Sequence, residues 1–189
     1  MPHHLIFEGA ELAGKSWLMS QIYDKLEFKY NKNHLTLDGC HWFNCDVGVY
    51  GTDKGKLIIK HYLQIFQELH DRNLLVEKFH LSDLVYNRMH QNKEVDYAAV
   101  EKQLQKLNFK IILIALPENK TIINKRIKDR LALYPHYERI LRDPEWYIKQ
   151  QREYVKEMEK STLEHLFLQT DCLPDKKLLD KILKFIGEN

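Results

Sequence analysis

The chain has 189 residues, of which 44% are hydrophobic and 30% are charged, and its formal net charge is +2 at pH 7. A chain of this length supports one sizeable core, so we expect a single domain over residues 1–189. The near-neutral charge gives no strong field for nucleic acid or an acidic membrane surface, which argues against both as partners.

Other bulk features point to a cytoplasmic protein. No run approaches the ~18 apolar residues of a membrane helix, and the first eight residues lack the pattern of a secretory signal. The three cysteines, an odd number, predict free thiols rather than a disulfide framework. Cys40, His41 and Cys45 lie close together but lack an evident fourth zinc ligand.

Short apolar runs alternate with longer helical patterns, which predicts βαβ units and a parallel sheet with helices between the strands. The run at 109–116 is the most apolar and ends before Pro117, as expected for a central strand covered on both faces. The expected strands are 4–8, 34–38, 73–77, 109–116 and 165–170. The expected helices are 15–28, 56–71, 82–91 (capped by Ser82), 95–107, 119–130, 143–160 (with Pro144 in its first turn) and 175–186.

The loop between the first strand and the first helix contains the sequence Gly9-x-x-x-x-Gly14-Lys15-Ser16, which is the Walker A pattern in its required context. Glycines let the backbone wrap around phosphates, and the helix N-terminus adds a dipole that favours anions. We therefore predict that the chain binds ATP and Mg²⁺, with Lys15 bridging the β- and γ-phosphates and Ser16 ligating the metal. The expected nucleotide-binding residues are Gly9, Ala10, Glu11, Leu12, Ala13, Gly14, Lys15, Ser16 and Trp17.

The flanks of this loop indicate what kind of P-loop protein this is. Three segments resemble the thymidylate kinase and deoxynucleoside kinase group. They are Phe-Glu-Gly at 7–9, "LLVEKFHLSDLVY" at 74–86 and "IILIALPENKTIINKRIKDR" at 111–130. The resemblance implies a three-layer P-loop fold, a sheet in the order 2-3-1-4-5, an arginine-bearing lid and a homodimer. Lys78 departs from the arginine usual in that group, and "LDGC" at 37–40 departs from its usual second-strand ending.

Two carboxylates are candidates for roles beside the phosphates. Glu77, at the end of the third predicted strand, is expected to hold Mg²⁺ or to orient the acceptor. Asp38, at the end of the second, either accepts a proton or binds a sugar, or else forms a turn before Gly39.

The candidate cations lie in and after the predicted helix 119–130. Arg126 and Arg130 are four residues apart on one helical face, and the resemblance implies that they close over the phosphates. Arg139 and Arg142 compete for this role.

The acceptor is expected at Lys78, Phe79, Ser82 and Tyr86. Lys78 and Arg88 are candidates to meet an acceptor phosphate. Flat aromatic faces suit a base, although each ring also suits a core. The aromatic candidates are Trp42, Phe43, Tyr50, Phe79 and Tyr86.

The leading hypothesis is a nucleotide kinase that phosphorylates a (deoxy)nucleoside monophosphate, thymidylate being the first candidate. One alternative is a kinase acting on the 5′-hydroxyl of a deoxynucleoside. Another is a nucleotide-binding regulator or NTPase without a small acceptor. A polynucleotide end kinase is disfavoured by the low net charge.

Overall fold

In a computed structural model, which describes residues 2–171 and 174–188, five parallel strands form one sheet in the order β2-β3-β1-β4-β5. The strands are β1 (His4–Glu8), β2 (Cys40–Asn44), β3 (Asn73–Glu77), β4 (Phe109–Ala115) and β5 (His165–Gln169). Central strands β1 and β4 are almost fully buried, as their continuous apolar sequences require. The strand order expected from the family resemblance is confirmed.

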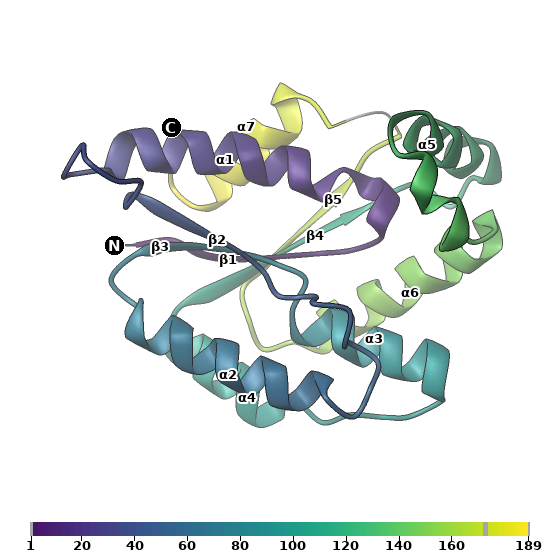
Figure 1. Cartoon of the computed structure of the whole chain (residues 1–189), viewed down its shortest axis with the longest axis horizontal. Helices are drawn as coiled ribbons and strands as arrows, with labels where there is room; N and C mark the ends of the chain where they lie inside the picture. Colours follow the sequence, from purple (N-terminus) through teal and green to yellow (C-terminus); the bar gives the residue numbers. More distant parts are fainter. Residues whose placement is uncertain (1, 172–173, 189) are drawn as a thin grey trace.

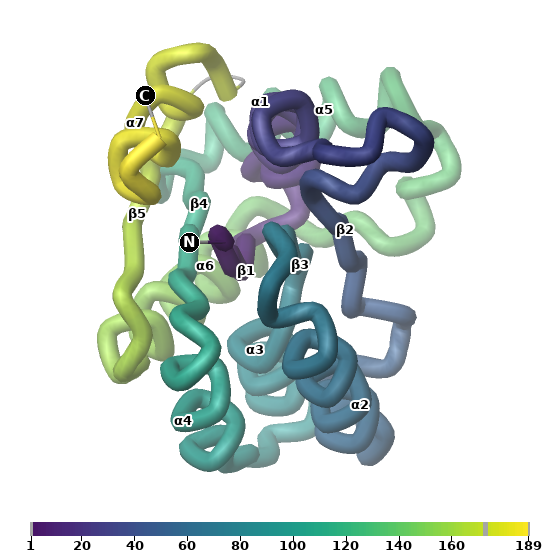
Figure 2. The backbone as a smooth tube through the Cα atoms, turned by 90° about the vertical axis from the view of Figure 1, so that its left-hand side faces the viewer, coloured from purple at the N-terminus to yellow at the C-terminus, as the bar shows by residue number. Residues whose placement is uncertain are grey.

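Helices cover both faces of the sheet, so the predicted three-layer α/β architecture is confirmed (Figures 1 and 2). Helices α1 and α7 lie on one face, whereas α2, α3, α4 and α6 lie on the other, and each face has its own apolar cluster. The helices are α1 (Lys15–Tyr30), α2 (Gly55–Glu68), α3 (His80–Gln91), α4 (Ala98–Lys106), α5 (Lys120–Leu133), α6 (Pro144–Lys160) and α7 (Lys176–Phe185), with short 3₁₀ turns η1 (Glu11–Ala13) and η2 (Pro135–Arg139).

Local sequence signals explain several helix starts. Asn119 caps α5 by accepting from the backbone N–H groups of Thr121 and Ile122, and Asp143 caps α6 at Trp146. Pro144 occupies the first position of α6, where its missing N–H costs nothing.

The predicted strand at 34–38 is wrong. The side chain of Asn33 accepts from the N–H groups of Leu35 and Thr36 and bends the chain there, and Leu35 is 90% exposed. Strand β2 begins instead at Cys40 and pairs with β3 from Asn73 onward. Alternating residues in 34–38 imitate a strand, but their apolar side chains have no core to face.

The placement of β2 moves Asp38 to the amino-terminal edge of the sheet. There its carboxylate accepts from Asn33 at 2.7 Å and lies 3.7 Å from the guanidinium of Arg72. The Walker A loop lies at the opposite, carboxyl edge, where ligands bind to such sheets. Asp38 is therefore too far from the loop for the catalytic role expected of it.

Both cysteines within the described residues, Cys40 and Cys45, are buried free thiols. The free thiol expected at Cys172 lies outside the described residues. No cluster of three metal-ligating side chains occurs among the residues that the structure describes. In the same part of the chain, no helix combines the length and apolarity needed to cross a bilayer.

The two ends of the described chain meet at a buried carboxylate. Glu188 accepts from Lys29, Tyr30 and His3 at 2.5, 2.5 and 2.8 Å. Burial alone raises the pKa of Glu188, but these hydrogen bonds outweigh it and lower the pKa to about 2.

This clasp predicts a pH-dependent contribution to stability. At pH 7 we expect Glu188→Gln to lower the free energy of unfolding by about 2 kcal/mol, because it weakens charge-assisted hydrogen bonds. Because the pKa of Glu188 is lower in the folded chain than in the unfolded one, the ionised carboxylate stabilises the fold at pH values above the unfolded pKa near 4.5. This contribution disappears as the pH falls from 4.5 towards 2. Urea unfolding of both proteins at pH 7, 5 and 3 measures it, and a constant difference would contradict it.

Candidate functional site

The carboxyl ends of β1, β2 and β3 meet at one edge of the sheet and set the position of the site. The strand register pairs Phe7 with Glu77, and Asn44 with Glu77. The loops that follow these three strands therefore lie next to one another, on the side of the molecule where α5 covers the sheet edge (Figure 1).

The Walker A loop leaves β1 at Gly9 and enters α1 after Gly14. Both glycines have positive φ, +119° and +81°, which side chains rarely adopt. A Cβ atom at Gly9 would lie 2.1 Å from the carbonyl oxygen of Ile114, and one at Gly14 would lie 2.4 Å from Pro174. The fold thus requires glycine at both positions, and the close-wrapped backbone suits a phosphate chain.

Lys15 is the central cation of this loop. Its buried amine donates to the carbonyl oxygens of Gly9 and Ala10 at 2.7 and 2.9 Å. Burial, with a further contribution from the charge of Lys78, lowers the pKa of Lys15 to about 8. A polyphosphate bound beside the amine favours its protonated form.

This lowered pKa predicts how nucleotide binding varies with pH. Below pH 8 Lys15 is already protonated, so its contribution to affinity is constant. Above pH 8 binding must take up a proton, and we expect the Kd for Mg-ATP to rise by up to about tenfold per pH unit. Calorimetry at pH 7.0, 8.5 and 9.5 in buffers of different ionisation enthalpy measures the affinity and the proton uptake. Binding without proton uptake at pH 9.5 would contradict the prediction.

Ser16 and Glu77 form an oxygen pair at the start of α1. The Ser16 hydroxyl donates to the Glu77 carboxylate at 2.8 Å. Hydroxyl and carboxylate oxygens are the hard ligands that Mg²⁺ prefers, and the ion normally keeps several waters. The chemistry of this pair fits a magnesium ion shared with nucleotide phosphates.

Lys78 joins the ends of two strands to the Walker A loop. Its amine donates to Asp46 at 2.7 Å and to Glu11 at 3.2 Å, and it lies over the ring of Tyr86 at 5.6 Å. Burial alone lowers the pKa of Lys78, but these neighbours outweigh it and raise the pKa well above its usual value. The residue also has a left-handed backbone, with φ of +57°.

These groups line one cavity of about 670 Å³. The cavity brings together the Walker A loop, the ends of β2 and β3, and the segment from the end of α5 through η2. Its lining residues are Glu11, Gly14, Lys15, Ser16, Trp17, Asn44, Asp46, Glu77, Lys78, Arg130, Leu133, Tyr134, Tyr137 and Pro174.

The four candidate lid arginines are in different environments. Arg130 lines the cavity. Arg126 is not among the lining residues and instead donates to the carbonyl oxygen of Leu12 in the Walker A loop, from Nε at 3.2 Å and from Nη2 at 3.1 Å. Arg139 and Arg142 are exposed and do not line this cavity.

The acceptor-side expectations for Phe79 and Ser82 are wrong. Phe79 is fully buried and packs against Phe66, with ring centroids 5.4 Å apart. Ser82 lies inside α3 rather than capping it, and its hydroxyl donates to Glu8 at 2.5 Å. Neither side chain faces the cavity.

Glu8 takes the place of the missing helix cap. Its buried carboxylate accepts from the backbone N–H groups of Phe79 and Ser82 at 2.9 and 3.3 Å. Burial raises the pKa of Glu8, whereas the donors from α3 oppose this rise. The end of β1 is therefore joined directly to the start of α3.

Arg88 and the remaining rings also lie outside this cavity. Arg88 pairs with three carboxylates, those of Glu94, Glu153 and Glu157, so it is already neutralised. Tyr50 is buried, Phe43 packs against the core beside β2, and Trp42 is 37% exposed. Of the five aromatic candidates, Tyr86 reaches the site, through its contact with Lys78.

Sequence reasoning missed Asp46, Tyr134 and Tyr137. Asp46 follows β2 and was hidden by the wrong placement of that strand. The two tyrosines lie at the end of α5 and in η2, in a segment searched for arginines alone.

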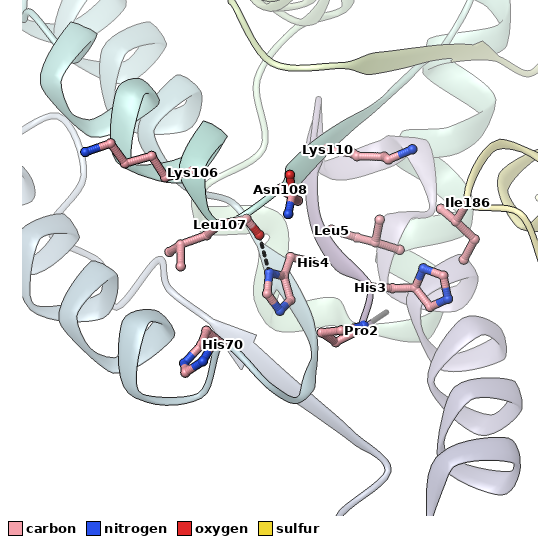
Figure 3. Close-up of a pocket in the computed structure, with 10 residues that line it drawn as sticks. All are labelled: Pro2, His3, His4, Leu5, His70, Lys106, Leu107, Asn108, Lys110 and Ile186. Carbon is pink, nitrogen blue, oxygen red and sulfur yellow. Dashed lines mark hydrogen bonds between the residues drawn. The ribbon is translucent and has the colours of Figure 1, made fainter.

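A second cavity, of about 600 Å³, lies at the opposite, amino-terminal edge of the sheet (Figure 3). His4 lies at its centre, and the two ring nitrogens of His4 contact the carbonyl oxygens of Leu107 and Arg72 at 2.5 and 3.0 Å. Lys106 and Lys110 extend in opposite directions in Figure 3, so they do not converge on one anion. This cavity is remote from the Walker A loop.

The chain has the fold of P-loop kinases. It superposes on the YorR protein of Bacillus subtilis, solved in complex with phosphorylated GDP, with a TM-score of 0.67 and 16% identity over 97% of this chain and 95% of that one. It is similar to the thymidylate kinase of Ehrlichia chaffeensis, with a TM-score of 0.59 and 11% identity over 98% of both chains. It is also similar to the deoxyadenosine kinase of M. mycoides, with a TM-score of 0.56 and 13% identity over 97% of this chain and 98% of that one. No protein-family model and no curated protein matches the sequence.

Proposed function

We propose that the chain is a phosphotransferase that moves the terminal phosphoryl group of ATP to the phosphate of a (deoxy)nucleoside monophosphate. One bond breaks between the γ-phosphorus and the β–γ bridging oxygen, giving ADP, and one forms to an acceptor phosphate oxygen, giving the diphosphate. The observation that carries the proposal is the shared cavity, in which Lys15, Lys78 and Arg130 surround the Ser16–Glu77 pair.

Each group has a role that follows from its position. Phosphoryl transfer needs alignment and positive charge around the moving group rather than covalent chemistry. Lys15 and the Walker A backbone bind the donor phosphates, and Arg130 supplies charge from the opposite wall. Ser16 and Glu77 would hold Mg²⁺, which supplies further positive charge to the donor when it is bound.

In this proposal the acceptor binds at the Lys78 side of the cavity. An acceptor phosphate would replace Glu11 or Asp46 as the partner of the Lys78 amine, which keeps that amine charged. Thymidylate is the first acceptor to test, because the resemblance to thymidylate kinases rests on the segments around Lys78.

An acceptor panel tests the proposal. The protein is incubated with Mg-ATP and, separately, each nucleoside and each monophosphate, and ADP and the phosphorylated product are quantified. The proposal expects ADP formation that depends on a monophosphate. ATP hydrolysis that no acceptor changes would support the regulator or NTPase alternative instead.

Asp46 favours a second candidate, a kinase for the hydroxyl of a nucleoside. Its carboxylate lines the cavity at the end of β2, and it would accept the proton of an attacking hydroxyl if a substrate displaced Lys78 from it. An acceptor phosphate needs no such base.

Two substitutions separate these candidates. For a monophosphate acceptor we expect Asp46→Asn to lower kcat by less than about tenfold and Lys78→Met to raise the acceptor KM by about tenfold or more. For a hydroxyl acceptor, Asp46→Asn should lower kcat by about 10²–10⁴-fold. The matched control is Asp53→Asn, because Asp53 is an almost fully exposed carboxylate on the same loop. Steady-state kinetics with the acceptor found in the panel decides between them.

A further inference from the structure

The guanidinium group of Arg130 is held by aromatic rings. Its central carbon lies 4.1 Å from the ring centroid of Tyr137 and 5.0 Å from that of Tyr134. Its Nε atom is buried without a hydrogen-bond partner among the residues that the structure describes. Within those residues, no carboxylate forms an ion pair with Arg130 at 4.0 Å or less.

Other arginines of the chain are paired differently. Arg88 contacts three carboxylates, and Arg152 makes two hydrogen bonds to Glu118 at 2.8 and 2.6 Å. A carboxylate neutralises a guanidinium and occupies its N–H donors. A ring contact attracts the cation through its face and leaves those donors available for an anion.

The backbone fixes the two rings relative to the arginine. The N–H of Tyr134 donates to the carbonyl of Arg130 at 2.8 Å, and the N–H of Tyr137 donates to the carbonyl of Tyr134 at 3.0 Å. The two rings also contact each other, with centroids 5.8 Å apart. Tight turns at the end of α5 and in η2 thus carry all three side chains into the cavity that contains Lys15.

We infer that Tyr134 and Tyr137 are positioning residues, which hold the Arg130 guanidinium in the cavity wall with its terminal N–H donors, unlike the buried Nε, open to the phosphates of the donor. The inference rests on the proposed function, because it assigns Arg130 a phosphate to bind. The rings act through Arg130 and do not touch the reacting atoms. The rings hold Arg130 as carboxylates hold Arg88 and Arg152, but they do not neutralise its charge.

A comparison of two ligands distinguishes this role from base stacking. Inorganic tripolyphosphate with Mg²⁺ carries the phosphates of ATP but has no base. In the full chain we expect the Tyr134→Leu/Tyr137→Leu double variant to raise the Kd of Mg-tripolyphosphate and of Mg-ATP by the same factor, about tenfold. The Tyr134→Phe/Tyr137→Phe variant keeps both rings and should restore wild-type affinity. Ile140→Ala, an exposed residue beside η2, is the matched control for the segment.

A double-mutant cycle tests whether the rings act through the arginine. In an Arg130→Ala background the tyrosine substitutions should have no further effect on Kd or on kcat, because their effect depends on the guanidinium. Melting temperatures identify any variant that has lost its fold, and single tyrosine variants then replace the double one.

The outcomes separate this inference from the proposed function. Equal weakening of both ligands, rescue by phenylalanine and no further effect without Arg130 support the positioning role. Weakening of Mg-ATP alone would show that the rings bind the base, and an undiminished effect in the Arg130→Ala background would show a role independent of the arginine. Either result overturns the inference. A chain that binds tripolyphosphate in this way but phosphorylates no acceptor would refute the kinase proposal alone.

Discussion

If the proposed function is correct, replacing Lys15 by methionine should lower kcat by about 10³-fold and leave the protein folded, because the amine would be the central positive charge at the donor phosphates. Lys15 is buried, and its lowered pKa shows that the fold disfavours the charged form. Methionine removes the buried charge but also the donor to the carbonyl oxygens of Gly9 and Ala10, so we expect these opposing effects to leave the melting temperature within a few degrees of wild type. Acceptor-dependent ADP formation and thermal unfolding measure the two effects.

A control on the same helix makes this result specific. Lys25→Met removes an exposed lysine from α1 and should change neither activity nor stability. Near-normal turnover in the Lys15→Met protein would mean that the donor phosphates bind elsewhere.

Glu77→Gln should lower kcat by about 10²-fold and raise the magnesium concentration needed for half-maximal rate. Glutamine keeps the size of the side chain and an acceptor for the Ser16 hydroxyl, but it removes the negative charge that would attract a magnesium ion. The measurement is a series of initial rates at fixed ATP and varied Mg²⁺.

Glu68→Gln, at the exposed end of α2, is the control for loss of one glutamate charge. If Glu77→Gln leaves the magnesium dependence unchanged, Glu77 does not contribute to a metal site. Its contact with Ser16 would then be purely structural.

The position of the Walker A loop between β1 and α1 follows from the sequence because its signals are local. The spacing from Gly9 to Ser16, the strand before it and the helix after it are all contiguous, and each glycine has a steric reason that no other residue satisfies. The same holds for β4, whose apolar run is long enough to identify without tertiary information. The sheet order itself came from the family resemblance.

The part of the cavity around Lys78 was predicted less well because its residues are brought together by long-range pairing. Whether 34–38 or 40–44 forms β2 is decided by pairing with β3, which local alternation cannot show. That one error moved the carboxylate at the strand end from Asp46 to Asp38. Phe79 and Ser82 matched a motif, yet their side chains serve the core and the carboxylate of Glu8. The homodimer implied by the resemblance stays a prediction.

The carboxylate of Glu8 has a consequence for how substrates enter and products leave. It joins the end of β1, where the Walker A loop begins, to the first turn of α3. These two segments cannot separate without exposing a buried carboxyl group. The end of α5 and η2 line the same cavity, and the contacts of Glu8 do not reach them. If the chain carries out the proposed phosphoryl transfer, we expect release of its products to depend on motion of the segment from the end of α5 through η2 more than on separation of β1 from α3.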